Sequence, residues 1–280
     1  MSLEQIEYKT EKLPALDLEK FEANPIEVGQ KYLEEIIDDL NHIYDNDFEK
    51  PVGVVEGYSL REHTEMVVHQ FTKYYHQFKN KLPDFITPDK FIQILAIHDI
   101  GKVDREVQEL KESGVEKREW KEKEEKRTKM KAEYILKNKI GYDGLKKDLV
   151  LEILSRGAKN IGSFITGNLS VDDFSKYIKD EAEKYQIKPN EFLDFLETYY
   201  ICDASAYTDE VLDDFKDKLG EEHYSKIKKL YEVDSQSQQP GAGITDWFNQ
   251  ESDNISFVNN NRFGDHKMKD WLEELRRRLV

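Results

Sequence analysis

The sequence predicts an all-α fold, and three observations support that class. Apolar side chains recur every three to four residues through most of the 280-residue chain, which is the period of an amphipathic helix. Capping residues precede several of these segments. Alternation of apolar and polar residues, which would indicate a strand, never extends beyond a few positions. With 15 Tyr, 14 Phe and 3 Trp, the chain has enough large apolar side chains for a sizeable core.

The first 58 residues are expected to form an arm, one helix and a loop. Residues 1–28 are charged and contain Pro14 and Pro25, so we interpret them as an extended or irregular arm. Residues 45–58 contain proline and glycine and are expected to form a loop. Between them, about 28–44 should be helical, with its apolar face formed by Tyr32, Ile36, Ile37, Leu40 and Ile43.

Two helices are expected to follow this loop. Ser59 and Glu62 form a capping-box pattern that opens a helix over about 60–79, with His63 close to its first turn. A second helix is capped at Thr87-Pro88, where proline suits the first helical position. Its sequence, FIQILAIHDI, is apolar on nearly every side, which is typical of a buried helix.

The rest of the chain is expected to be helical, with glycine-rich or polar interruptions. The densely mixed charges of KREWKEKEEKRTKMK indicate a solvated helix face, within one long helix or two in series. Gly157, Gly162 and Gly167 interrupt the pattern and indicate a flexible stretch near Arg156 and Lys159. The expected helices span about 104–139, 145–155, 171–185, 189–207, a segment ending near 233, and 265–279.

A polar linker, DSQSQQPGAG, begins at Asp234 and suggests how the chain is divided. We divide it into 1–58, a central domain over 59–233, and a C-terminal segment over 234–280. This last segment is expected to pack on the domain or to mediate assembly, so a homo-oligomer is left open. Its large apolar side chains are Trp247, Phe248, Phe257, Phe263 and Trp271.

Composition indicates which kinds of ligand the protein binds and in which cellular compartment it is expected. A formal net charge of -16 argues against a protein that grips a nucleic-acid backbone, since that requires clustered Lys and Arg. Small substrates are favoured, and a phosphorylated one would need a locally positive pocket. Cys202 is the only cysteine, so no intramolecular disulfide can form. We recognise neither a signal peptide nor a membrane-spanning segment, and a cytoplasmic protein is the expectation.

The segment LAIHDIGK, residues 95–102, carries the chemistry. There His98 and Asp99 end an otherwise apolar helix, and a buried carboxylate must be paired with a cation, a metal or hydrogen-bond donors. Imidazole nitrogen and carboxylate oxygen suit metals such as Zn, Mn, Fe and Ni. Two ligands do not complete a coordination shell, and His63 and Asp203, each on a helix with apolar neighbours, are the best additional candidates. The alternative is four unrelated polar residues.

The order His63, then His98-Asp99, then Asp203 resembles the HD-domain superfamily of metal-dependent phosphohydrolases, over about residues 59–210. The resemblance implies an HD-domain-like helical bundle in which these four side chains hold one divalent metal, namely Mn, Fe, Co, Ni, Zn or Mg. It also implies hydrolysis of a phosphate ester or anhydride, with a nucleotide or another small phosphorylated metabolite as substrate. Such a metal activates water and neutralises phosphoryl charge, and Asp99 would orient that water or accept its proton.

Several cations are candidates for binding the substrate phosphate. Gly101 places Lys102 one turn beyond the His-Asp pair, so we predict a catalytic and substrate-binding role for its ammonium group. For each of the other candidates the alternative is an ordinary surface charge. These candidates are Arg61, Arg105, Arg127, Arg156 and Lys159.

The chain departs from the richer HD-domain patterns at several positions. Thr128 stands where members with two or three metals would have a histidine, and the downstream double-histidine position reads Ser155-Arg156-Gly157. A site for one metal is therefore expected. Lys102 occupies the position of a glutamate in some alarmone and nucleotide hydrolases, which leaves open whether Asp104 or Glu106 substitutes as a base.

Two alternative functions are kept beside the phosphohydrolase. One is an HD-type nuclease, which would need a basic groove in spite of the acidic net charge, formed by the lysine-rich stretch 121–139. The other is a catalytically inactive sensor that keeps the pocket for a nucleotide ligand. Turnover of small phosphorylated compounds would distinguish the phosphohydrolase from both the nuclease and the sensor.

Overall fold

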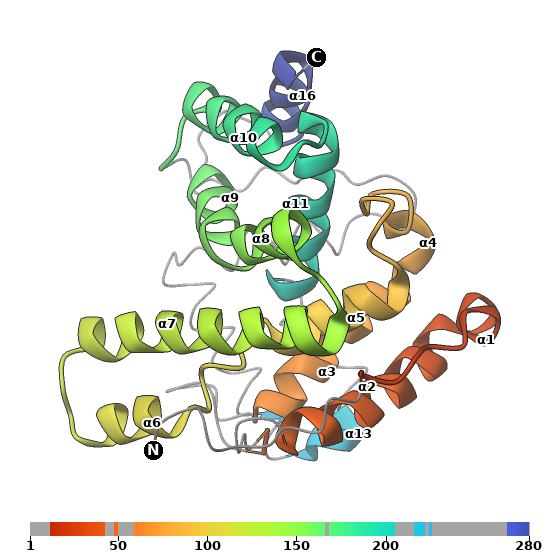
Figure 1. The fold of residues 1–280 in the computed structure, drawn as a ribbon, viewed down its shortest axis with the longest axis vertical. Helices are drawn as coiled ribbons and strands as arrows, with labels where there is room; N and C mark the ends of the chain where they lie inside the picture. Colours follow the sequence, from red (N-terminus) through yellow and green to blue (C-terminus); the bar gives the residue numbers. More distant parts are fainter. Residues whose placement is uncertain are drawn as a thin grey trace.

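The fold is known from a computed structural model, which describes residues 12–42, 48–49, 59–165, 168–204, 216–221, 224–225 and 268–279. Within these ranges every regular element is a helix, and Figure 1 shows them stacked along the long axis of the molecule. The predicted all-α class is confirmed. None of the described helices is long and apolar enough to cross a membrane.

The N-terminal part is more helical than expected. Helix α1 spans Leu18–Ala23 and α2 spans Pro25–His42, so the prediction of an irregular arm is wrong from residue 18 onward. The side chain of Asp17 accepts a hydrogen bond from the Lys20 backbone and caps α1. Pro25 begins α2 because the first helical position tolerates proline. Residues 1–11 and most of the predicted loop 45–58 lie outside the described residues.

The next helices begin where the capping signals place them. Helix α3 spans Leu60–Lys73 and is followed by the short α4, Tyr75–Phe78. The capping box is confirmed: Ser59 accepts from the backbone of Glu62 at 3.1 Å, and Glu62 accepts from the backbone of Ser59 at 2.6 Å. Helix α5, Pro88–Ile97, starts at the predicted proline, and its residues 91–97 are all buried.

The segment after α5 forms a helical hairpin. Helix α6 spans Arg105–Glu112 and α7 spans Lys117–Ile135, continuing as the π-helical turn η2, Leu136–Ile140. Of the two sequence interpretations, two helices in series is therefore the correct one. Gly114, with φ +73°, allows the chain to reverse between α6 and α7. Figure 1 shows the two helices running antiparallel at one side of the molecule.

The glycine-containing segment is helical, contrary to the prediction of a flexible stretch. Helix α8 spans Gly144–Glu152, the π-helical turn η3 spans Ile153–Gly157, and α9 spans Ala158–Ile165. A Cβ atom at Gly157 would lie 3.1 Å from both the Leu196 side chain and the Glu152 carbonyl. Glycine at position 157 allows close packing of η3 on α11. From the sequence pattern alone, a glycine used for close packing looks the same as a glycine that breaks a helix. Gly167 lies outside the described residues.

The C-terminal elements close the helical stack. Helix α10 spans Val171–Tyr185, α11 spans Pro189–Ala204, α13 spans Lys216–Leu219, and α16 spans Met268–Leu279. Helix α16 packs on α10 and α11, and its Leu275 and Leu279 are buried. The last helix therefore packs on the domain. This was one of the two expectations for the C-terminal segment, the other being assembly. The predicted linker and the side chains of Trp247, Phe248, Phe257, Phe263 and Trp271 lie outside the description.

The hydrophobic core is continuous through the described elements. Leu33, Ile36 and Ile37 of α2 belong to the same buried cluster as Phe195 and Leu196 of α11. Helix α2 packs on α3 and α5, and α3 in turn contacts α11. The core thus crosses residue 58, where the sequence suggests a boundary, and the three-part division stays a prediction. This packing brings one end of α3, α5 and α11 together.

Candidate metal centre

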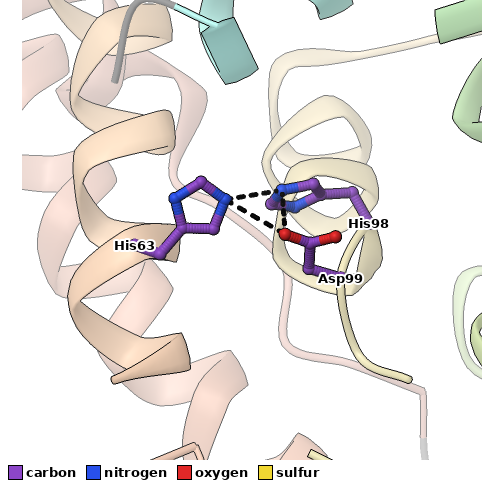
Figure 2. A group of neighbouring side chains, drawn as sticks. All are labelled: His63, His98 and Asp99. Carbon is purple, nitrogen blue, oxygen red and sulfur yellow. Dashed lines mark hydrogen bonds and ion pairs between the residues drawn. The ribbon is translucent and has the colours of Figure 1, made fainter. Parts of the chain in front are cut away.

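Three helices supply the four candidate ligands. His63 lies in the first turn of α3, where the Ser59 capping box sets the start of the helix. His98 and Asp99 follow the last residue of α5, and Asp203 lies next to the last residue of α11. Figure 2 shows the His63 ring pointing from α3 toward His98 and Asp99 at the end of α5. Residues that are 140 positions apart in the sequence therefore meet at one point.

The ligand atoms converge closely. His63 Nε2 lies 3.1 Å from His98 Nε2 and 3.2 Å from Asp99 Oδ2, and the distance from His98 Nε2 to Asp99 Oδ2 is 3.3 Å. Asp203 Oδ1 lies 3.6 Å from His63 Nε2 and 3.4 Å from His98 Nε2. Within the described residues, His63, His98 and Asp99 form a group whose ligand atoms all lie within 4.8 Å of one another and could hold a metal ion.

These separations fit a single small cation. Nitrogen and oxygen ligands about 2.1 Å from one metal lie about 3.0 Å apart at a right angle and about 3.4 Å apart at the tetrahedral angle. The five measured separations run from 3.1 to 3.6 Å. Two histidines and two aspartates are also a donor set that Mn, Fe, Co, Ni and Zn accept. The residues present therefore fit the metal that the sequence predicts.

One hydrogen bond fixes the orientation of the His98 ring. Its Nδ1 lies 2.5 Å from the Leu95 carbonyl oxygen, which can only accept, so Nδ1 carries a proton. Whenever the ring is neutral, the lone pair is on Nε2, the atom that faces His63 and Asp99. A backbone partner for the second nitrogen is the usual support of a metal-binding histidine. Tyr199 packs its ring edge-on to His98, with the ring centroids 6.3 Å apart.

Exposure within the cluster is uneven. The side chains of His63 and His98 are 1% and 2% exposed, whereas those of Asp99 and Asp203 are 19% and 31% exposed. The imidazoles thus form the floor of the site and the carboxylates its open side. Cys202 is buried beside Asp203, and burial raises the pKa of its thiol well above the ordinary value. As expected for a core thiol, it is not an activated nucleophile.

The pKa values indicate that the centre of the cluster favours positive charge. Burial alone would raise the pKa of Asp99, but the charges of Lys102 and His98 hold it well below its usual range. Burial also opposes ionisation of Asp203, while hydrogen bonds from His63 and His98 lower its pKa. Burial lowers the pKa of His98, yet Asp99 and Asp203 raise it to about 10. Both carboxylates are ionised, and either a proton or a metal ion can supply the positive charge between them.

Lys102 is the candidate phosphate ligand that contacts the cluster. Its Nζ forms an ion pair with Asp99 Oδ2, the same oxygen that faces both imidazoles. Burial lowers the pKa of Lys102, but the charge of Asp99 outweighs this and raises it, so the ammonium is retained. The predicted proximity of Lys102 to the His-Asp pair is therefore present in the structure. Its catalytic role stays a prediction.

The weaker candidate cations all have carboxylate partners outside the cluster. The pairs are Arg61 with Asp38 and Glu49, Arg105 with Glu109, Arg127 with Asp104 and Glu106, Arg156 with Glu152 and Glu181, and Lys159 with Glu125. Their predicted contacts with substrate phosphate stay predictions. The two proposed replacement bases are also engaged: Arg127 contacts both Asp104 and Glu106, and Lys131 takes the second oxygen of Asp104.

The sequence analysis missed two supports of the site. Tyr199 received no role, although it precedes Asp203 by four residues and therefore shares its face of α11. Asp104 was considered only as a base, although an aspartate directly before a helical segment is a recognisable capping residue. Its side chain does accept from the Glu106 backbone at 3.1 Å.

The chain was also compared with known proteins. No family model matches it, no curated protein matches it, and no solved structure matches it. The resemblance to the HD-domain superfamily therefore depends on the sequence motifs and stays a prediction.

Proposed function

We propose that this protein is a metal-dependent phosphohydrolase of the HD-domain type that acts on a nucleotide or another small phosphorylated metabolite. The observation that carries the proposal is the convergence of two imidazole Nε2 atoms and two carboxylates from α3, α5 and α11, with separations of 3.1 to 3.6 Å. Buried histidines facing ionised carboxylates at this spacing are suited to hold one divalent cation.

The chemistry divides between the cation and the side chains around it. A divalent cation held by His63, His98, Asp99 and Asp203 would supply Lewis acidity, which makes water more acidic and offsets charge on a phosphoryl oxygen. Asp99, part of the open side of the site, orients the attacking water and accepts its proton through its carboxylate. Burial holds both histidines, and the hydrogen bond to the Leu95 carbonyl also fixes the ring of His98.

Lys102 is assigned to the substrate phosphate. Its ammonium already lies against Asp99 and stays charged, so it can approach an anionic group bound beside that carboxylate. A point charge with rotatable donors is a common phosphate ligand. Such a local cation is needed because the net charge of -16 repels anions over most of the surface.

A small substrate is preferred over a polymer because carboxylates neutralise part of the lysine-rich stretch 121–139. Carboxylates pair with many cations of α7 and the residues around it: Lys121 with Glu124, Lys123 with Glu106, Arg127 with Asp104 and Glu106, Lys131 with Asp104, and Lys147 with Glu133. This arrangement gives little support to the basic groove that a nuclease requires. A cytoplasmic setting, consistent with a single buried cysteine, belongs to the same proposal.

The test is phosphate release from a panel of nucleotides and sugar phosphates, each with Mn, Mg, Co, Ni or Zn added. The wild-type chain is compared with Asp99→Ala and with Glu197→Gln, a matched change of a buried carboxylate on α11 away from the cluster. We expect metal-dependent turnover in the wild type and in Glu197→Gln, and its loss in Asp99→Ala.

The other outcomes identify the alternatives. Salt-sensitive cleavage of single-stranded DNA or RNA, without release of phosphate from small substrates, would support a nuclease. Binding of a nucleotide without turnover in any metal would support the sensor. Equal turnover in Asp99→Ala and in the wild type would exclude this site as the catalytic centre.

A further inference from the structure

Asp104, at the far end of the turn that carries Asp99, attaches this turn to helix α7. Asp104 is 7% exposed, and both of its carboxylate oxygens are engaged. Oδ1 accepts from the Glu106 backbone at 3.1 Å and lies 3.3 Å from Arg127 Nε. Oδ2 lies 3.1 Å from the Nζ atom of Lys131, which is itself 3% exposed. One buried carboxylate thus caps α6 and joins it to α7.

The turn between Asp99 and Asp104 is hydrogen-bonded within itself and packs directly against α7. The backbone of Lys102 donates to the Asp99 carbonyl at 2.8 Å, and the backbone of Asp104 donates to the Gly101 carbonyl at 3.1 Å. A Cβ atom at Gly101 would lie less than 3.0 Å from both the Oγ1 and the backbone nitrogen of Thr128 on α7. The turn therefore rests directly on α7, and Asp104 fastens its end there.

We infer that Asp104 is a positioning residue that keeps the Asp99 carboxylate at the correct distance from the two imidazoles. Arg127 and Lys131 contribute indirectly, by holding Asp104 in place. This inference rests on the proposed metal centre. His63 and Asp203 lie within helices, whose own hydrogen bonds hold them. Asp99 lies beyond the end of α5, in a turn, so its position depends on contacts made elsewhere.

The inference assigns Arg127 a different role from the one expected from sequence. Its guanidinium contacts Asp104 and Glu106 at the start of α6, where it joins the two helices of the hairpin. The hairpin is therefore the frame on which the His98-Asp99 turn rests. Ligand placement within about 0.5 Å is needed for a metal site to bind tightly, so loosening this frame should weaken the metal.

The test is a calorimetric titration of the full chain with Mn²⁺, comparing the wild type with Asp104→Asn. We expect the variant to remain helical by circular dichroism and to bind Mn²⁺ about ten- to a hundredfold more weakly, as is typical when a supporting partner is lost. The control is Glu181→Gln on α10, which carries none of the candidate ligands. Glu181 is also 7% exposed and contacts two cations, Arg156 and Lys184.

The control separates positioning from a loss of general stability. Glu181→Gln should lower the thermal midpoint by an amount similar to Asp104→Asn but leave the affinity for Mn²⁺ unchanged. If Asp104→Asn does not fold, Lys131→Gln is used instead, because it removes the ion pair with Asp104 from the α7 side. A folded variant of either kind with wild-type affinity overturns the inference. A wild-type chain that binds none of Mn, Co, Ni or Zn instead overturns the metal centre itself.

Discussion

Helix α11 carries two carboxylates, the buried Glu197 and the partly exposed Asp203, that are balanced in different ways. Glu197 Oε2 accepts from the Arg276 guanidinium of α16 at 2.7 Å, and the same guanidinium donates to Asp194 at 2.8 Å. Asp203, six residues further along, faces the imidazoles of His63 and His98 instead. The charge of Glu197 is therefore neutralised by a permanent cation, Arg276. Asp203 instead faces ring nitrogens that also face Asp99.

The difference shows how a structural acidic residue is distinguished from a candidate ligand on the same helix. An arginine is a permanent counter-charge for a carboxylate, because it stays charged at every physiological pH. The imidazoles instead face the negative charges of Asp99 and Asp203, which Lys102 offsets only in part, so the centre of the cluster favours a positive charge that either a proton on His98 or a metal ion can supply. The Glu197 region should therefore govern stability, and the Asp203 region should govern binding.

The largest expected effect is on metal affinity. Replacement Asp203→Asn removes one charged donor of the cluster and should weaken Mn²⁺ binding at least about a hundredfold. Glu197→Gln, on the same helix, should leave it unchanged. Isothermal titration of both variants checks the contrast. Equal affinities would show that Asp203 is only a neighbour of the histidines and not a ligand.

A somewhat smaller effect is expected from adding metal to the wild-type chain. A ligand at about one hundred times its dissociation constant stabilises the folded state by about 2.7 kcal/mol, which should raise the thermal midpoint by several degrees. Removing the metal with EDTA should reverse the shift, and His98→Gln should abolish it. Differential scanning calorimetry measures all three. A shift that persists in His98→Gln would place the metal elsewhere.

The Arg276 contact should contribute to stability but not to binding. Replacement Arg276→Ala leaves Glu197 buried without its guanidinium partner, an arrangement that is strongly destabilising when both groups are fully buried. Because the Arg276 side chain is 37% exposed, solvent reduces the cost, and we expect a loss of about 2 kcal/mol. Urea denaturation measures it. An accompanying change in Mn²⁺ affinity would contradict the separation of the two regions.

The smallest expected effect is the pH dependence that comes from Glu197. Burial raises its pKa above the ordinary 4.5, with Asp194 adding to the shift and Arg276 and Lys81 opposing it. A raised pKa in the folded state stabilises the fold below pH 4.5, and this contribution is lost as the pH rises through the folded pKa. Glu197→Gln should therefore gain stability relative to the wild type on going from acid to neutral pH.

Urea midpoints measured between pH 4 and pH 7.5 would test this dependence. The midpoint of Glu197→Gln minus that of the wild type should increase as the pH rises. A difference that decreases toward neutral pH would show that Arg276 outweighs burial and that the Glu197 pKa is lowered instead.

Most of the helical architecture could be predicted from local signals. The start of α3 follows from the Ser59 capping box, the start of α5 from Pro88, and the buried character of α5 from its sequence alone. The errors occurred where a local signal has two meanings. Pro25 begins a helix instead of disrupting one, and Gly157 allows η3 to approach Leu196 instead of making the chain flexible. Only the packing partner decides between those meanings.

The identity of the four candidate ligands could be read from the sequence, because two histidines and two aspartates on apolar helices need partners when they are buried. Helix periods and caps act over a few residues, so the sequence by itself also determined the helical class of the protein. The tertiary structure alone decided the separations of 3.1 to 3.6 Å between the ligand atoms, the attachment of Asp104 to Lys131, and the pairing of Arg276 with Glu197. Those contacts join residues far apart in the chain, and their geometry depends on how whole helices pack against one another.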